Sequence, residues 1–187
     1  LIYNEIFVKE EYLGDTLSGD VSVTNTLYLL GVTSGAGYTT TVGCNATVVG
    51  GSSFTYIDGA VKKDFCTTGA FDFPVGQNQY SKVNANVTAL GTVPSSLTVT
   101  PYDATLGGFT PATSLSRNWN LEETGDLTAD LLFYYDDADV NGTESDYRAY
   151  KRAGNGVVTD MCGGPCVDTV NNIIGPVSGV SSFSRWT

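Results

Sequence analysis

The sequence contains no histidine, one methionine and only 9 basic residues against 20 acidic ones. Without histidine, neither a Ser–His or Cys–His nucleophile pair nor a mixed Cys/His zinc site can form. The formal net charge of −11 leaves too few Lys and Arg side chains to neutralise a nucleic-acid backbone or to bind an anionic membrane surface. We therefore expect no nucleic-acid partner and no membrane insertion.

Long hydrophobic runs and helical patterns are also missing. No apolar run approaches the ~18 residues that a membrane span requires, and no segment combines a helical apolar stripe with a cap. No glycine-rich phosphate loop precedes a helix. The adjacent Glu122 and Glu123 would point to opposite faces of a strand, which argues against a carboxylate pair for glycoside cleavage. We expect no enzymatic activity and no cofactor apart from a weakly bound calcium ion.

Glycine (22 residues), tyrosine (11 residues), valine and threonine are abundant instead. Valine, threonine and tyrosine suit a pleated, half-buried surface, and glycine supplies the positive φ angles of tight turns. Short apolar stretches alternate with turn residues along the whole chain. This pattern predicts an all-β protein, an antiparallel β-sandwich of immunoglobulin-like or jelly-roll-like form.

Three segments are expected along the chain. Residues 1–13 form an extended N-terminal strand, residues 14–60 a strand-rich segment, and residues 61–187 the sandwich, packed with 14–60 as one compact unit. The apolar stretches between 17 and 61 fit either a meander or the rungs of a short β-solenoid, although their spacing is too irregular to define a repeat. The start at Leu1 without an initiator methionine suggests a processed or excised segment.

The N-terminal strand is apolar on both faces, which is typical of a strand enclosed within a structure. It can be an ordinary first strand, or a donor strand that completes the sheet of a neighbouring molecule. The candidate assembly residues are Leu1, Ile2, Tyr3, Ile6, Phe7 and Val8.

Four cysteines allow three pairings. Cys44 and Cys66 flank a segment interpreted as a hairpin, and Cys162 and Cys166 are separated only by Gly-Gly-Pro. We expect the disulfides Cys44–Cys66 and Cys162–Cys166, with an all-cysteine zinc site or a different pairing as open alternatives. Disulfides indicate an oxidising location outside the cytosol.

Two further kinds of site are indicated by local motifs. Acceptor triplets for N-glycosylation begin at Asn45, Asn86 and Asn141 and fit a secreted protein, although such triplets also arise by chance. Asp137, Asp139 and Asn141, followed by a glycine, match the first positions of a calcium loop, but the closing acidic ligand is missing. The alternative is a loop in which these side chains bond to their own backbone.

Five motifs, in this order, resemble a β-sandwich module of large secreted bacterial surface and adhesin-like proteins. They are residues 56–59 (YIDG), 71–76 (FDFPVG), 117–121 (RNWNL), 132–140 (LFYYDDADV) and 182–186 (SFSRW). The resemblance implies an extracellular β-sandwich, often preceded by solenoid-like strands, with no catalytic role. The four cysteines depart from the usual pattern.

These observations favour an extracellular or cell-surface structural subunit that polymerises with itself into a filament through its N-terminal strand. The alternative is a non-catalytic carbohydrate-binding or adhesive module that recognises surface glycans. The second hypothesis predicts a face of exposed aromatic side chains, which can stack on sugar rings.

Overall fold

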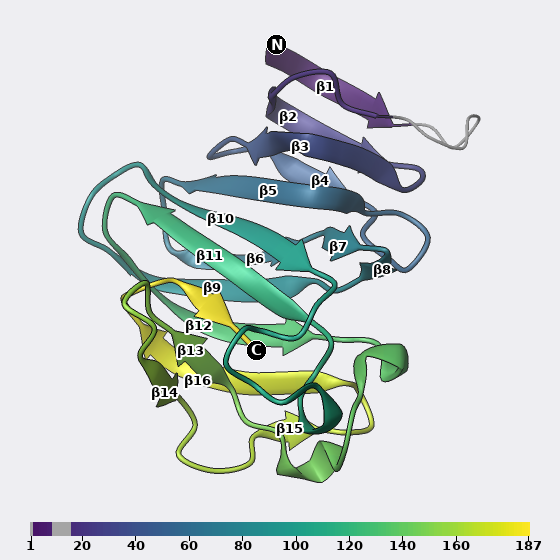
Figure 1. Ribbon diagram of the computed structural model, residues 1–187. Helices are drawn as coiled ribbons and strands as arrows, with labels where there is room; N and C mark the ends of the chain where they lie inside the picture. The colour runs from purple at the N-terminus through teal and green to yellow at the C-terminus, as the bar shows by residue number, and fades with distance from the viewer. Residues whose placement is uncertain (1, 9–15) are drawn as a thin grey trace.

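The structure, a computed structural model, describes residues 2–8 and 16–187 (Figure 1). It contains two packed sheets and, among the described residues, three short 3-10 turns but no α-helix, so the predicted all-β sandwich is confirmed. The larger sheet has the strand order β1-β2-β3-β5-β10-β11-β17-β13-β14, with β4, β7 and β8 attached at its side. The smaller sheet has the order β15-β16-β12-β9-β6. No helix in the described part of the chain is long and apolar enough to cross a membrane.

The N-terminal strands of the larger sheet form a β-solenoid. They are β1 (Ile2–Val8), β2 (Val21–Leu29), β3 (Thr33–Val42), β4 (Thr47–Val49), β5 (Ile57–Phe65) and β7 (Val75–Gln77). Their pairings with one another are all parallel. Ile2 lies opposite Ser22, Val23 opposite Val42, Thr33 opposite Ile57, and Ile57 opposite Val75, which are separations of 20, 19, 24 and 18 residues. Parallel strands that repeat about every 20 residues without a crossover helix are successive turns of one coil.

The coil has three sides, because its strands stack in three columns. The first column contains residues 21–23, 40–42 and 61–63, and the second contains 26–28 and 47–49. In the third column, Ser34 lies opposite Asp58, and Asp58 lies opposite Gly76. Of the two arrangements that the sequence left open for this segment, the structure therefore has the solenoid. The boundary expected after residue 60 falls inside β5, which belongs to both the coil and the sandwich.

The sandwich begins where β10 (Ser95–Tyr102) pairs antiparallel with β5. The larger sheet continues through β11 (Asn118–Thr124), β17 (Arg185–Trp186), β13 (Tyr150–Arg152) and β14 (Val158–Asp160). The smaller sheet contains β6 (Gly69–Phe73), β9 (Val83–Leu90), β12 (Leu127–Tyr134), β15 (Val167–Asp168) and β16 (Ile173–Val180). The remaining elements are β8 (Gln79–Tyr80) and the 3-10 turns η1 (Pro111–Thr113), η2 (Asp137–Asp139) and η3 (Glu144–Asp146).

Trp119, Phe133 and Trp186 form the centre of the sandwich. The ring of Phe133 lies 5.2 Å from that of Trp119 and 5.3 Å from that of Trp186. In β12, every second side chain from Leu127 to Phe133 is buried, as its apolar alternation predicts. Buried residues of the coil, such as Val23, belong to the same continuous hydrophobic cluster. The coil and the sandwich thus share one core.

Candidate functional site

The predicted donor strand, β1, is the first turn of the coil and lies at its outer end. β1 pairs in parallel with β2, with Tyr3 opposite Val23 and Ile6 opposite Leu27. Within the described residues, no strand pairs with the outer edge of β1, and Figure 1 shows β1 at the end of the molecule farthest from β16. The candidate residues Ile2, Tyr3, Ile6, Phe7 and Val8 therefore belong to the chain's own sheet, whereas Leu1 lies outside the described residues.

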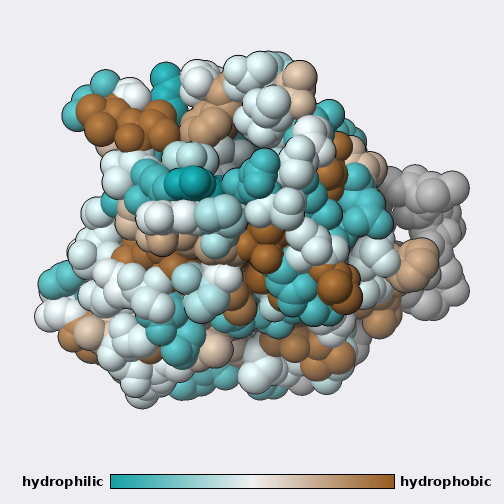
Figure 2. Space-filling model, turned by 90° about the horizontal axis from the view of Figure 1, so that it is seen from below, coloured by the Kyte–Doolittle hydropathy of each residue, from teal (hydrophilic) through white to brown (hydrophobic). Residues whose placement is uncertain are grey.

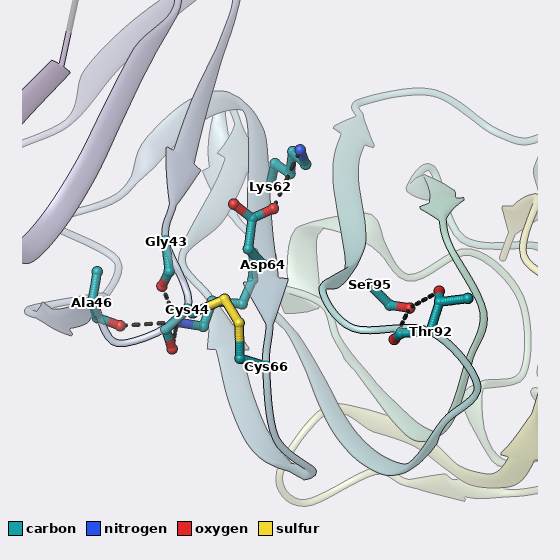
Figure 3. Close-up of a disulfide and its surroundings, with 9 residues drawn as sticks. Gly43, Cys44, Ala46, Lys62, Asp64, Cys66, Thr92 and Ser95 are labelled. Atoms are coloured by element: carbon teal, nitrogen blue, oxygen red, sulfur yellow. Dashed lines mark hydrogen bonds and ion pairs between the residues drawn. A yellow bond between two sulfur atoms is a disulfide. The ribbon is translucent and has the colours of Figure 1, made fainter.

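Both expected disulfides are present. The Sγ atoms lie 2.01 Å apart in Cys44–Cys66 (Figure 3) and 2.15 Å apart in Cys162–Cys166. No cysteine remains free for a zinc site. The first disulfide links the turn after β3 to the end of β5 and therefore joins two neighbouring strands of the coil.

A buried lysine supports the same turn. The Nζ atom of Lys63 donates to the carbonyl oxygens of Gly43 (2.6 Å), Cys44 (3.2 Å) and Ala46 (2.9 Å). Burial lowers the pKa of Lys63, and the three carbonyl oxygens provide the partners that a buried ammonium group requires. Lys63 is therefore a structural residue of the coil.

The three glycosylation candidates lie in different environments. Asn45 and Asn86 are exposed. The Nδ2 atom of Asn141 instead donates to the carbonyl oxygens of Ser114 (3.2 Å) and Asp139 (3.3 Å). Asn45 and Asn86 thus have accessible side chains, whereas that of Asn141 takes part in the loop structure.

The calcium candidates do not converge on one point. Asp139 is buried and pairs with Arg117, and the Oδ1 atom of Asp137 accepts a hydrogen bond of 2.7 Å from Asn172. Asn141 bonds to main-chain carbonyl oxygens, as described above. Within the described residues there is no group of three acidic or cysteine side chains arranged to hold a metal ion. The loop therefore uses these side chains for structure, but Asp137 and Asp139 bond mainly to the side chains of Asn172 and Arg117 and not only to the loop's own backbone.

A groove of about 550 Å³ crosses the outer face of the larger sheet, over β3, β5, β10 and β11. Its lining includes two tyrosines, two carboxylates, a glutamine and several small residues, among them Tyr38, Asp58, Gln77, Thr98, Tyr102 and Glu122. This is the candidate binding site of the molecule, and we call it the outer groove.

One wall of the outer groove is a bulge in β3. Ser34 lies opposite Asp58 and Thr39 opposite Ala60, so residues 35–38 face a single residue of β5. Ala36 and Gly37 have φ angles of 49° and 86°, in the left-handed region that non-glycine residues rarely adopt. The Thr39 amide donates to Oδ1 of Asp20 at 2.9 Å and anchors the end of the bulge.

The opposite wall is Tyr102, at the end of β10. The guanidinium group of Arg185 lies 4.7 Å from the centre of the Tyr102 ring. The floor between the walls is low because its side chains are small. A Cβ atom at Gly59 would lie only 3.1 Å from the Cα atom of Gly35, so these two glycines allow β3 and β5 to approach closely.

The polar side chains of the groove are held by neighbours. The Nδ2 atom of Asn120 donates to Oε1 of Glu122 at 2.8 Å, and the Oε1 atom of Gln77 accepts from the Asp103 amide at 2.7 Å. Burial raises the pKa of the Asp58 carboxyl, against smaller opposing effects of a hydrogen bond from the Asn78 amide and the charge of Arg117. The groove can therefore present oriented acceptors beside two aromatic rings.

The sequence did not single out Tyr38 or Tyr102. Gly35, Ala36 and Gly37 interrupt the alternation just before Tyr38, and this interruption was the one available signal of a bulge. No sequence signal links Tyr38 to Tyr102. Their strands, β3 and β10, are brought together by pairing with opposite edges of β5, and this pairing is visible only in the structure.

No family model, curated protein or solved structure matches this chain. The resemblance to surface β-sandwich modules therefore stays a prediction based on its five motifs. In the structure, several motif residues perform packing roles: the Tyr56 ring covers Gly76 so closely that a Cβ atom there would collide with it, and Trp119 and Trp186 form the core.

Proposed function

We propose that this chain is a non-catalytic, extracellular structural subunit that assembles end to end into a surface filament by exchanging its N-terminal strand. The observation that carries the proposal is the position of β1 as the terminal turn of the coil, paired with β2 alone among the described strands. The two disulfides support an oxidising, extracellular location.

Exchange of β1 between two molecules preserves its pairing with β2, so the net change in free energy is small. The β1 strand of a second copy can occupy the same position on β2 and form the same main-chain hydrogen bonds, which is the logic of domain swapping. Seven residues connect Val8 to Thr16, a span of up to about 27 Å when extended. Donor and acceptor are different surfaces, so exchange from each copy to the next extends into an open chain when the rotation between copies does not close, whereas reciprocal exchange between two copies gives a dimer.

The surface of the sandwich end supports the same choice of interface. Seen from that end, hydrophobic residues form separate patches between hydrophilic ones (Figure 2). Separate patches of this kind offer less for a stable contact than a full strand of main-chain groups.

The net charge of −11 opposes association, because the subunits repel one another at low ionic strength. At physiological ionic strength, salt largely screens the repulsion between charges that are more than about 8 Å apart. Assembly is therefore expected to increase as salt is added.

A cysteine pair placed across β1 and β2 tests the proposal. Glu5 lies opposite Thr26, and neighbouring strands are close enough for a disulfide between Glu5→Cys and Thr26→Cys. If strands are exchanged, oxidation of the double variant traps a ladder of covalent multimers on non-reducing gels, and negative-stain electron microscopy shows filaments. The Glu5→Cys single variant, which cannot form a ladder by this route, is the matched control.

The proposal fails if the double variant forms only the intramolecular disulfide and remains monomeric at every protein and salt concentration. A peptide of residues 1–13 provides a second measurement. It should compete for β2 and shorten the filaments, whereas a peptide with the same composition in scrambled order should leave their length unchanged.

A further inference from the structure

We propose that the outer groove, between Tyr38 and Tyr102, binds a neutral polysaccharide chain. The inference does not depend on filament assembly, because the groove lies on the face of β3, β5, β10 and β11 and includes no residue of β1. It rests on three features of the groove: the aromatic walls, the strained bulge and the charge of the lining.

The aromatic walls suit the apolar faces of sugar rings. The Tyr38 side chain is 39 % exposed although it belongs to a strand in the middle of the sheet order. Tyr102 is half-buried, and Arg185 covers its ring at 4.7 Å and limits its movement. Two rings on opposite sides of a shallow groove can contact pyranose units through their C–H faces while the sugar hydroxyl groups stay in water.

The bulge that carries Tyr38 is strained. Ala36 adopts the left-handed conformation, which is unfavourable for a residue with a Cβ atom. Strained backbone of this kind is concentrated at ligand sites, where the surrounding structure maintains it. Here the Asp20–Thr39 hydrogen bond and the close approach of Gly35 and Gly59 maintain it. A simple continuation of β3 would avoid the strain but would remove the wall that Tyr38 forms.

The polar lining selects for a neutral ligand. Asp58 and Glu122 offer carboxylate oxygens that can each accept hydrogen bonds from neighbouring sugar hydroxyls, and Gln77 adds an amide. The residues that line the groove include no lysine and no arginine, and the whole chain is strongly acidic. An acidic polysaccharide or a nucleic acid would therefore be repelled, whereas a neutral sugar chain needs only the hydrogen-bond acceptors and the rings.

The floor determines the shape of the ligand that fits. Ala60, Thr98 and Thr100 form it, between Tyr38 on one side and Tyr102 on the other. These small side chains leave an open trough with no end wall of large residues among the described lining. Such a trough accommodates an internal stretch of a long chain, in contrast to a closed pocket that holds a single terminal sugar.

Affinity gel electrophoresis with soluble polysaccharides tests the inference. The probes are hydroxyethyl cellulose, xylan, galactomannan and dextran as neutral chains, and polygalacturonate as an acidic one, extended by a printed array of neutral glycans. At least one neutral chain should retard the protein. Tyr38→Ala and Tyr102→Ala should each weaken its binding at least tenfold, whereas Tyr38→Phe, which keeps the ring, should bind normally.

The matched control is Tyr134→Ala, which removes a half-buried tyrosine ring from the smaller sheet, where Lys82 lies over it at 4.3 Å. It should bind like the unmodified protein. Circular dichroism establishes that each variant is folded, so that a loss of binding is not a loss of structure. The inference is overturned if no neutral glycan binds, if only polygalacturonate binds, or if binding survives in a folded Tyr38→Ala/Tyr102→Ala double variant.

Discussion

Arg117 and Asp139 form a fully buried, two-pronged ion pair. The Nε and Nη2 atoms of Arg117 donate to the two carboxylate oxygens of Asp139, both at 3.0 Å. The Nη1 atom of the same guanidinium donates to the carbonyl oxygen of Gln77 at 2.7 Å. The pair therefore connects the start of β11 and the turn η2 to β7, the last strand of the coil.

Removal of the carboxylate should destabilise the protein strongly. Asp139→Ala leaves the buried Arg117 charge with only the partly exposed Asp103 carboxylate, whose Oδ1 atom lies 3.8 Å from Nη2. The loss of the buried partner should cost roughly 3–5 kcal/mol. Urea unfolding measures this loss. Asp137→Ala, two residues away and exposed, is the control and should cost less than about 1 kcal/mol. Equal effects of the two variants would contradict a special role for the buried pair.

The two core tryptophans should differ in their sensitivity to substitution. The Nε1 atom of Trp119 donates to the carbonyl oxygen of Ser81 at 2.8 Å, whereas the Nε1 atom of Trp186 has no acceptor among the described residues. Trp119→Phe leaves a buried carbonyl unpaired, but Trp186→Phe removes an unpaired donor. We expect Trp119→Phe to cost about 1–3 kcal/mol more in urea unfolding. Equal costs for the two variants would show that the lost ring volume decides, and a larger cost for Trp186→Phe would contradict the prediction.

The sandwich was predictable from the sequence because its strands alternate. In β12, apolar side chains at every second position predict one buried face, and the structure has it. The coil was less predictable, because the residue separation between paired strands varies from 18 at Ile57–Val75 to 24 at Thr33–Ile57. Corners and the β3 bulge absorb extra residues without a repeating motif, so the period is visible only in space.

The candidate sites show the same division between local and long-range information. Cys162 and Cys166 are close in sequence, so their spacing favours the disulfide that the structure contains. The acidic motif around Asp139 is local too, but Arg117, the partner of Asp139, lies 22 positions earlier. Nothing in the motif indicates that Asp139 binds an arginine side chain and not a metal ion. Tyr38 and Tyr102 are farther apart still, and only the stacking of β3, β5 and β10 brings them to one groove.

The two disulfides should contribute unequally to stability. Cys44–Cys66 closes a loop with a sequence separation of 22 residues, and Cys162–Cys166 one of 4. In the chain-entropy model, the longer loop stabilises by about 3 kcal/mol and the shorter by about 2 kcal/mol. Thermal and urea unfolding of Cys44→Ser/Cys66→Ser and Cys162→Ser/Cys166→Ser measure the two values. A larger loss for the second variant would mean that the short loop does more than restrict the unfolded chain.

Alkaline pH should unfold the protein through its buried tyrosines. Burial is the largest cause that raises the pKa of Tyr56, Tyr80, Tyr135 and Tyr147 above the ordinary value of 10.0. The folded state therefore keeps these hydroxyl groups protonated, whereas the unfolded chain releases their protons near pH 10. Their contribution to stability is complete below pH 10 and is lost as the pH rises above it. Lys63 acts in the opposite direction. Its pKa is lowered by burial from the ordinary value of 10.5, so the folded state loses the buried charge at a lower pH than the unfolded chain does, and stability rises as the pH approaches 10.5.

Tyr135 provides the sharpest test of this pH dependence. Its hydroxyl group donates to Oε1 of Glu144 at 2.6 Å, and this hydrogen bond adds to burial in raising the pKa of Tyr135. Tyr135→Phe should lower stability at pH 8, because the hydrogen bond is lost, yet its stability should fall less steeply between pH 10 and 11 than that of the unmodified protein. Urea unfolding at each pH, with tyrosine ionisation followed by absorbance, measures both effects. Parallel stability curves for the two proteins would show that Tyr135 ionises equally in the folded and unfolded states, contrary to its burial.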